Sequence, residues 1–411
     1  MKILMLITEL GYGGAERAFL GLAAELAKRH EVEIVLYQRH YATGTYAQEE
    51  QPVALPIHFL DERGGSGRIA RWRRRLTRLR MIKDAFRPDV TVSFLTGPNL
   101  LNVLTRRRDK VVVSVRGTRR YDLSQPACSR WAYVSTIDPL IVRRSDLVVS
   151  VSESLTREIS GARGINIPAK FKTVSGYVNA AKLVGTACTP VETEVEALAQ
   201  FPLIVGAGRI APDKGFQHLI ARFAAVKRSE PNAKLLLVGD GPAMKMLVEQ
   251  ACGLNLLVAD GIADELSQFD VIFLGFRPDP YRYYRLGRVF VLASMTDGFP
   301  NTLAEALATG VPILAVDAPW GAREVLGLPA DPLNRPFATL VPEETGLGTL
   351  MPRMDRPEFA RMWEEVLLDR LHNDRRSVDQ TSRQLDRLRQ LDASQAATKW
   401  EALLLKMVGN E

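Results

Sequence analysis

The chain has 411 residues, and 46% of them are hydrophobic, which is enough for two sizeable globular cores. No apolar stretch approaches the roughly 20 residues that span a bilayer, and the five histidines and three cysteines show no spacing typical of metal ligands or a disulfide framework. The formal net charge of +7 indicates an anionic partner: nucleic acid, a membrane surface or a phosphorylated ligand.

Short continuous apolar runs alternate with helical patterns along the chain. Such runs are typical of strands buried on both faces, so the sequence predicts an α/β, doubly wound fold with parallel sheets. The predicted strands are Ile3–Ile7, Glu33–Tyr37, Asp89–Phe94, Val111–Val115 and Asp146–Val151, then Pro202–Gly206, Lys234–Gly239, Asp270–Leu274, Val289–Ala293 and Pro312–Val316. Ten strands are too many for one compact open sheet. Two Rossmann-like domains are therefore expected, over residues 1–184 and 185–385.

A glycine-rich loop that contains Gly13 and Gly14 follows the first predicted strand and precedes a helix with one apolar face. Glycine allows the backbone to approach a ligand closely, and a helix N-terminus offers free N–H groups to an anion. The loop lacks the third glycine of the dinucleotide fingerprint. By itself it is equally compatible with a simple tight turn between a strand and a helix.

Residues 63–86 combine many arginines with an apolar helical face made by Ile69, Trp72, Leu76 and Leu79. Like charges one turn apart repel, so such a helix favours contact with an anionic membrane surface. The alternative is a helix that packs on the first domain with a solvated polar side. Nucleic acid is not expected, because no recognised binding motif accompanies the charge. The predicted membrane contacts are Arg68, Arg71, Trp72, Arg75 and Arg78.

Two strand-to-helix junctions in the second half carry candidate ligand-binding groups. The first places Arg209 and Lys214 at the carboxyl end of a strand, where open α/β sheets bind ligands. Arginine can clamp a phosphate through two hydrogen bonds, and lysine supplies a compact charge. Two solvated surface cations are the alternative for this junction.

The second junction contains Asp297, before a predicted helix that opens at Pro300, and Glu305 within that helix. Free N–H groups suit a phosphate, and carboxylates suit hydroxyl groups. Glu305 lies in an otherwise apolar helix and needs a polar partner there, which favours a binding role over ordinary surface charge.

The order of these segments resembles glycosyltransferase family 4, a retaining group with the GT-B architecture. The matching pieces are Gly-Gly-Ala-Glu-Arg near the amino terminus, Gly-Arg-x4-Lys-Gly, Val-Gly-Asp-Gly-Pro, Phe-Leu-Gly-Phe, Gly-Phe-Pro-Asn-x-Leu-x-Glu-Ala and Asp-Ala-Pro-Trp-Gly-Ala-Arg-Glu-Val-Leu. The resemblance is strongest to bacterial enzymes that extend lipid-linked oligosaccharides or surface polysaccharides. It implies an acceptor-binding first domain, a donor-binding second domain, a central cleft, and a C-terminal helix over 386–411 that crosses back onto the first domain.

The resemblance also implies roles for individual residues. Arg209 and Lys214 would hold the donor diphosphate, Asp297 would contact the transferred sugar, and Glu305 would bind ribose hydroxyls. Gly13 and Gly14 would approach the diphosphate from the other domain. The backbone that meets the sugar and β-phosphate would comprise Gly298, Phe299, Pro300, Asn301, Thr302 and Leu303.

Two positions depart from the family pattern. The family usually has Glu where this chain has Asp297, whose carboxylate reaches one methylene less. Many relatives have a His after the strand that corresponds to Val111–Val115, whereas this chain has Arg116. Arginine cannot serve as a general base, so we expect Arg116 to bind an anionic acceptor group instead.

The expected function is retaining transfer of a hexose or N-acetylhexosamine from a nucleotide-sugar, with UDP preferred, to a lipid-linked or polysaccharide acceptor. No cofactor is expected, because the chain has no Asp-x-Asp and cationic side chains could neutralise the leaving diphosphate. Free thiols and the basic helix favour a cytoplasmic protein at the inner face of the membrane. The alternatives are a non-catalytic nucleotide-sugar- or membrane-binding scaffold and a nucleotide-sugar epimerase.

Overall fold

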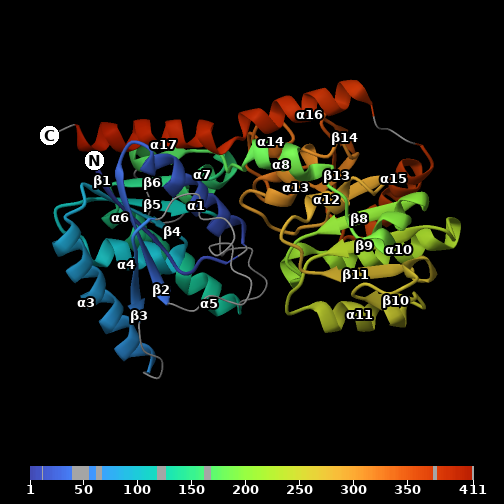
Figure 1. Cartoon of the computed structure of the whole chain (residues 1–411), viewed down its shortest axis with the longest axis horizontal. Coiled ribbons are helices and arrows are strands. Elements are labelled where there is room, and N and C mark those ends of the chain that lie inside the picture. Colours follow the sequence, from blue (N-terminus) through green and yellow to red (C-terminus); the bar gives the residue numbers. More distant parts are fainter. Residues whose placement is uncertain are drawn as a thin grey trace. The chain divides into compact units, whose positions relative to one another are not determined.

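The computed structural model describes residues 1–11, 13–38, 55–61, 67–117, 126–161, 168–373 and 377–409. They form two compact units, each with its own sheet (Figure 1). Unit 1 comprises the described residues up to Val178 together with those from Leu391 onward, and unit 2 comprises Asn179–Gln390.

Within the described ranges, unit 1 contains a seven-stranded parallel sheet with the order β3-β2-β1-β4-β5-β6-β7. Its strands are β1 (Lys2–Ile7), β2 (Glu31–Gln38), β3 (Ile57–Asp61), β4 (Val90–Phe94), β5 (Lys110–Val115), β6 (Leu147–Ser150) and β7 (Phe171–Thr173). Its α-helices are α1 (Gly14–Ala27), α3 (Arg68–Phe86), α4 (Thr96–Leu104), α5 (Ala127–Ala132), α6 (Asp138–Arg144), α7 (Glu153–Ser160) and α17 (Ala393–Val408). A π-helix spans Tyr133–Ile137 and a 3-10 turn spans Pro168–Lys170.

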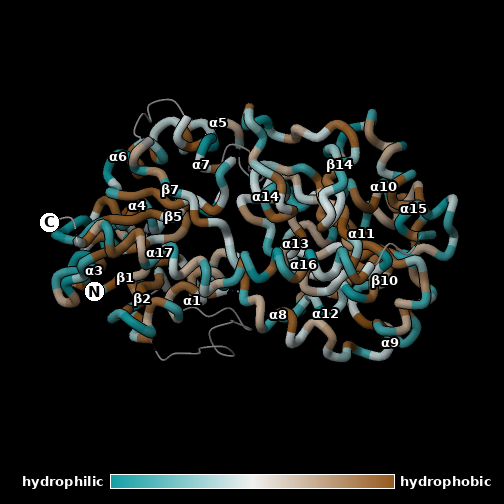
Figure 2. Tube along the Cα trace, turned by 90° about the horizontal axis from the view of Figure 1, so that it is seen from above, coloured by the Kyte–Doolittle hydropathy of each residue, from teal (hydrophilic) through white to brown (hydrophobic). Residues whose placement is uncertain are grey.

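Successive side chains of a strand point to opposite faces of the sheet, and in unit 1 both faces are covered by helices. On β1, Ile3, Met5 and Ile7 join a core with α1 and α17, whereas Leu4 and Leu6 join a core with α3. This double burial explains the continuous apolar runs of the sequence. Figure 2 shows the hydrophobic colours of the central strands, such as β1 and β5, beside the more hydrophilic α3.

Helix α17 belongs to the core of unit 1, although it follows unit 2 in the sequence. Trp400 is only 1% exposed and stacks on Phe94 of β4 with ring centroids 6.1 Å apart. Glu401 accepts hydrogen bonds from Arg29 and His30 at 2.7 and 2.9 Å. The return of a C-terminal helix to the first domain is therefore confirmed, and Figure 1 shows it beside α1.

Unit 2 contains, in its described residues, an eight-stranded sheet with the order β10-β11-β9-β8-β12-β13-β15-β14, in which only β14 runs antiparallel to its neighbour. Its strands are β8 (Leu203–Ala207), β9 (Lys234–Val238), β10 (Val258–Asp260), β11 (Val271–Gly275), β12 (Val289–Leu292), β13 (Ile313–Val316), β14 (Glu343–Glu344) and β15 (Thr349–Met351). Its α-helices are α8 (Ala180–Ala187), α9 (Thr193–Glu196), α10 (Phe216–Ser229), α11 (Met244–Gly253), α12 (Tyr281–Tyr284), α13 (Asn301–Leu307), α14 (Ala322–Val325), α15 (Ala360–His372) and α16 (Val378–Gln390). Its 3-10 turns span Ala197–Gln200, Pro212–Lys214, Leu266–Gln268 and Pro357–Phe359.

One face of the unit 2 sheet packs against α10, α11 and α15, with Trp363 of α15 fully buried in that core. On the other face, Tyr284 of α12 packs on Phe290 of β12 with ring centroids 4.6 Å apart. All ten predicted strands are present as β1, β2, β4, β5 and β6 in unit 1 and β8, β9, β11, β12 and β13 in unit 2.

The boundary between the units lies a few residues before the predicted one. Residue 184 falls inside α8, and this whole helix belongs to unit 2, where Thr186 and Tyr281 of α12 share a hydrogen bond of 2.7 Å. At the second crossing, α16 belongs to unit 2 and α17 to unit 1, so the chain returns at Leu391 rather than at residue 386.

Candidate active site

The central feature of unit 2 is an ion pair at the point where its strand order reverses. From β8 the chain moves to β9 on one side and later to β12 on the other, and open α/β sheets bind ligands at such switch points. The loops after β8 and β12 carry Lys214 and Asp297. Lys214 Nζ lies 2.6 Å from Asp297 Oδ2, across 83 residues of sequence. The structure thus brings together two of the three predicted catalytic side chains.

A close backbone contact fixes the position of Lys214. The residue lies in the 3-10 turn Pro212–Lys214, and Gly215 ends that turn with a φ of +71°. A Cβ atom at Gly215 would lie 2.0 Å from the carbonyl oxygen of Ala293, at the start of the loop that carries Asp297. The amide of Met295 also donates to the carbonyl of Asp213 at 2.8 Å. The two loops are therefore held against each other, and only glycine suits this position.

The loop after β13 holds Asp297 from the other side. The Asp297 amide donates to the Pro319 carbonyl at 2.6 Å, and the Asp297 carbonyl accepts from the amides of Trp320 and Gly321 at 2.7 and 2.9 Å. A Cβ at Gly321 would lie 2.6 Å from the carbonyl oxygen of Gly298. The Asp-Ala-Pro-Trp-Gly segment thus forms a backbone brace for the carboxylate loop.

Glu305 is the buried carboxylate of the site. It lies in α13 and is 4% exposed, and Tyr284 Oη donates a hydrogen bond of 3.1 Å to its Oε2 atom. Tyr284 is itself fully buried against Phe290. The expectation that Glu305 needs a polar partner is confirmed, and sequence reasoning missed Tyr284 because no motif marks it.

The backbone between these carboxylates turns into α13 without help from a side chain. Pro300 occupies the N-cap position, and its carbonyl accepts from the amides of Leu303 and Ala304 at 3.0 and 3.2 Å. Of the predicted donor-binding segment, Asn301 and Thr302 are half-buried, and the other four residues are buried: Gly298, Phe299, Pro300 and Leu303.

Arg209 occupies the same loop as Lys214 but has a different environment. Its side chain is 63% exposed and lies 3.3 Å from Asp213, four residues along the chain. Because this pair is exposed and close in sequence, it stabilises the loop little. Arg209 therefore lies in the same loop as Lys214 but forms an ion pair with Asp213.

The Val-Gly-Asp-Gly-Pro segment supports the Arg209 loop through its glycines. Gly239 has a φ of +144°, and a Cβ atom there would lie 1.9 Å from the carbonyl oxygen of Gly208. A Cβ at Gly241 would lie 2.4 Å from the carbonyl oxygen of Ile210. The backbones after β8 and β9 are too close for side chains, and this contact sets the shape of the loop that presents Arg209.

In unit 1, Gly13 is the N-cap of α1 and Gly14 is its first residue. The side chain of Glu16 folds back over this turn, because a Cβ atom at Gly13 would lie 2.1 Å from Glu16 Oε2. The glycine loop therefore carries a carboxylate directly over the position where an anion was expected to approach the helix end. Sequence analysis did not assign Glu16 a role.

Arg116 follows β5 and lies among aromatic rings. Its guanidinium is 5.3 Å from the centre of the Phe94 ring and 5.8 Å from that of Tyr177, whose hydroxyl donates to the Ala18 carbonyl at 2.7 Å. Burial lowers the pKa of Arg116, while Tyr177 and Glu16 oppose that shift. Arg116 thus belongs to one electrostatic group with Glu16 at the carboxyl edge of the unit 1 sheet.

The basic helix α3 is arranged differently from the expectation. Arg75 was predicted to contact a membrane, but it is only 9% exposed, forms two contacts of 2.6 and 2.7 Å with Asp61 Oδ2, and lies over the Tyr37 ring at 4.1 Å. The prediction for Arg75 is wrong, because this arginine pairs with the buried carboxylate of Asp61. Trp72 is half-buried against the same core, whereas Ile69, expected on the apolar face, is 75% exposed.

The other predicted membrane contacts differ in their exposure. Arg71 is half-buried and Arg78 is exposed, while the Arg68 side chain lies outside the described residues. No helix in the described part of the chain is both long enough and apolar enough to cross a membrane.

Two family profiles match most of the chain. Residues 13–171 match the profile described as "Glycosyl transferase 4-like domain", and residues 201–368 match "Glycosyl transferases group 1". The chain belongs to the glycosyltransferase family that these two profiles describe. The two matches correspond to unit 1 and unit 2, so this glycosyltransferase carries the Lys214–Asp297 pair in its group 1 part.

Individual relatives agree with this assignment. An uncharacterized glycosyltransferase of Methanocaldococcus jannaschii is 27% identical over 52% of this chain and 56% of its own length. An N-acetylgalactosamine-N,N'-diacetylbacillosaminyl-diphospho-undecaprenol 4-alpha-N-acetylgalactosaminyltransferase of Campylobacter jejuni is 24% identical over 79% of this chain and 83% of its own length.

Among solved structures, HepE of Anabaena in complex with UDP and glucose is similar with a TM-score of 0.71 and 17% identity, over 98% of this chain and 99% of that one. At this identity the likeness shows the fold alone, which is the predicted GT-B class with two Rossmann-like domains.

Proposed function

We propose that this glycosyltransferase moves a hexose or N-acetylhexosamine from a UDP-sugar to a lipid-linked or polysaccharide acceptor in bacterial glycan biosynthesis, with retention of anomeric configuration. The observation that carries the proposal is the Lys214–Asp297 pair at the switch point of unit 2, next in sequence to the buried Glu305. A similar structure holds UDP and glucose, and a relative acts on a diphospho-undecaprenol acceptor.

Each side chain has a chemical task in this proposal. Lys214, aided by Arg209, neutralises the diphosphate as the bond between the anomeric carbon and the phosphate oxygen breaks. Asp297 accepts hydrogen bonds from hydroxyls of the transferred sugar and shares Lys214 with the diphosphate. Glu305, held by Tyr284, accepts from the ribose hydroxyls. These tasks require no metal.

The proton of the acceptor needs a destination in this reaction. The acceptor oxygen bonds to the anomeric carbon on the face that the diphosphate leaves, and its proton passes to the departing β-phosphate oxygen. No protein base is then required, which suits Arg116 at the position where the family resemblance implies a histidine in many members. UDP and the glycosylated acceptor are the products.

The first experiment is nucleotide binding. Calorimetric titration with UDP, GDP and ADP is expected to show selective binding of UDP to the wild type, weakened about tenfold or more by Glu305→Ala, because charged hydrogen bonds to hydroxyls are lost. Tyr284→Phe is the matched control, since it removes the partner of Glu305 but keeps the carboxylate. Its effect should be smaller than that of Glu305→Ala.

Release of UDP in the presence of UDP-sugar and acceptor then separates an enzyme from a binding scaffold, and proton NMR of the product reports its anomeric configuration. If the protein binds the UDP-sugar but releases no UDP with any acceptor of a broad panel, the result would favour the non-catalytic scaffold. An inverted product would contradict the retaining mechanism.

We also propose that Arg116 binds an anionic group of the acceptor, because its guanidinium follows β5 at the carboxyl edge of the unit 1 sheet, beside the rings of Phe94 and Tyr177. Arg116→Ala is expected to raise the acceptor KM about tenfold while the donor KM stays within about twofold. Steady-state kinetics with both substrates varied gives these values. Equal changes in the two KM values would contradict the assignment.

The exposed arginines of α3, including Arg73, Arg78 and Arg80, are proposed to contact an anionic membrane surface. Arg75 is excluded from this set because it is paired with Asp61 in the interior. We propose that this contact holds the enzyme at the cytoplasmic face of the membrane, where a lipid-linked acceptor is accessible.

A further inference from the structure

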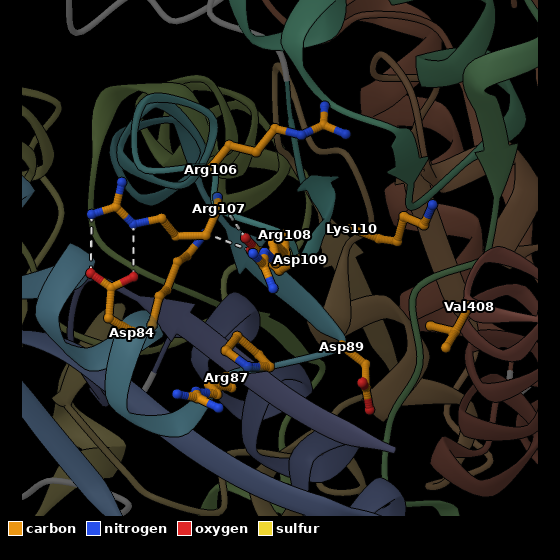
Figure 3. Close-up of a pocket in the computed structure, with 11 residues that line it drawn as sticks. Asp84, Arg87, Asp89, Arg106, Arg107, Arg108, Asp109, Lys110 and Val408 are labelled. Carbon is orange, nitrogen blue, oxygen red and sulfur yellow. Dashed lines mark hydrogen bonds and ion pairs between the residues drawn. The ribbon is translucent and has the colours of Figure 1, made fainter. Parts of the chain in front are cut away.

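Unit 1 has a second cationic feature, an open pocket at the edge of its sheet opposite to Arg116. The pocket has a volume of about 780 Å³ and lies where β4 and β5 begin, between the end of α3 and the turn from α4 to β5 (Figure 3). Its charged lining comprises six cationic and three acidic side chains, an excess of three positive charges: Lys83, Arg87, Arg106, Arg107, Arg108 and Lys110 against Asp84, Asp89 and Asp109. The glycine loop and Arg116 follow β1 and β5, so they lie at the other ends of these strands.

A buried polar network forms the base of this pocket. Lys83 and Asp109 are 0% and 1% exposed and lie 2.7 Å apart. Asn102 also accepts from Lys83 Nζ at 2.9 Å, and Thr91 donates to Asp109 at 2.6 Å. The Arg107 amide donates to the second oxygen of Asp109 at 2.9 Å. This buried network therefore fixes the turn that carries the three consecutive arginines Arg106, Arg107 and Arg108.

Two of these three arginines are held by acidic partners. Arg106 lies 2.8 Å from Asp146, and Arg107 lies 2.9 and 3.1 Å from the two oxygens of Asp84, as Figure 3 shows for the latter pair. Both pairs are partly exposed, so their charges are only partly compensated. Burial lowers the pKa of Lys83, Asp109 opposes this shift, and Arg106 and Arg107 add to it.

Arg87 and Arg108 complete the cationic lining. Both are exposed, and neither has an acidic partner among the described residues. Arg87 ends α3 with a φ of 52°, and its amide donates to the Lys83 carbonyl at 2.9 Å, so its backbone is fixed to the same network. The pocket therefore presents two uncompensated guanidinium groups on a rigid base, a combination suited to an oxyanion with several acceptor oxygens.

We infer that this pocket is a phosphate-binding site, separate from the donor site, that takes a phosphomonoester or diphosphate group through Arg87 and Arg108. A phosphate with its two negative charges compensates most of the local positive excess and offers each guanidinium two oxygens. The group has two possible sources, a soluble phosphate compound or the headgroup of an anionic lipid, because the pocket is open.

The experiment uses the full-length chain with Arg209→Ala and Lys214→Ala as the reference, so that pyrophosphate cannot use the proposed donor site. In calorimetric titration with pyrophosphate, adding Arg87→Ala and Arg108→Ala is expected to weaken binding about tenfold or more. The matched control adds Lys245→Ala and Arg361→Ala, which remove two positive charges from side chains that are each 90% exposed in unit 2. The control should keep the affinity of the reference protein.

A second arm measures sedimentation of the wild type and the Arg87/Arg108 variant with phosphatidylcholine vesicles that contain phosphatidic acid. Loss of vesicle binding in the variant assigns the site to a lipid headgroup, whereas loss of pyrophosphate binding alone assigns it to a soluble phosphate. Equal affinities of the pocket and control variants for pyrophosphate, with unchanged vesicle binding, would overturn the inference. Unchanged circular dichroism spectra establish that the variants are folded, and failure of UDP binding has no bearing on this result.

Discussion

Replacing Lys214 with alanine is expected to lower the transfer rate by about 100- to 1,000-fold, the effect typical of losing one group that stabilises developing negative charge. Lys214 Nζ is 2.6 Å from Asp297 and its turn is fixed by the contact between Gly215 and Ala293, so its ammonium is held at the carboxyl end of β8. Single-turnover measurements of UDP release at saturating donor give the rate of the chemical step.

Arg209→Ala is the natural comparison, since both residues lie in one loop. Its side chain is 63% exposed and already faces Asp213, so we expect a loss at least about tenfold smaller than that for Lys214→Ala. Lys214→Arg keeps the charge but not the compact ammonium, and should recover activity only in part. A Lys214→Ala variant with wild-type single-turnover rates would remove this residue from the mechanism.

Replacing Asp109 with alanine is expected to destabilise unit 1 by about 3–5 kcal/mol, because it leaves the buried Lys83 ammonium without its counter-ion. The carboxylate also accepts from Thr91 and from the Arg107 amide, and both groups lose their partner. Hydrogen exchange by mass spectrometry tests this: peptides from β4 and β5 should lose protection, whereas peptides from β8 and β12 in unit 2 should not.

Two variants give this prediction its controls. Asp84→Ala removes a partly exposed ion pair with Arg107 and should cost less than about 1 kcal/mol. Combining Lys83→Met with Asp109→Asn removes both charges and should restore much of the protection in β4 and β5. If Asp109→Ala exchanges like the wild type, the buried pair does not stabilise unit 1.

Most of the fold could be predicted from the sequence, because the central strands are apolar on both faces and therefore form continuous apolar runs. The strands that the sequence analysis missed are β3, β7, β10, β14 and β15, which are two to five residues long and lie at or next to sheet edges. Their periodicity is too short to distinguish them from loops. In β3, His58 is paired with Glu33 of β2, a contact that no local pattern indicates.

The sequence predicted which residues belong to the candidate site but not how these residues are placed relative to one another. Sequence placed Lys214 and Asp297 at the ends of two strands, yet their pairing depends on β8 and β12 being neighbours and on glycines that let three loops touch. For Arg75, the predicted environment itself was wrong. Its helical position was compatible with an exposed face, but the decisive partner, Asp61, lies at the end of an edge strand that was not recognised.

The chain order of the two units has a consequence for how the protein is made. Unit 2 is an insertion between Val178 and Leu391, two residues joined by a hydrogen bond of 3.0 Å from the Val178 amide to the Leu391 carbonyl. A ribosome that has finished Val178 must add the roughly 200 residues of unit 2, on the order of 10–40 s of synthesis, before α17 emerges. During this interval the surface around Phe94 that later receives Trp400 stays uncovered, so unit 2 can complete its core before unit 1 does.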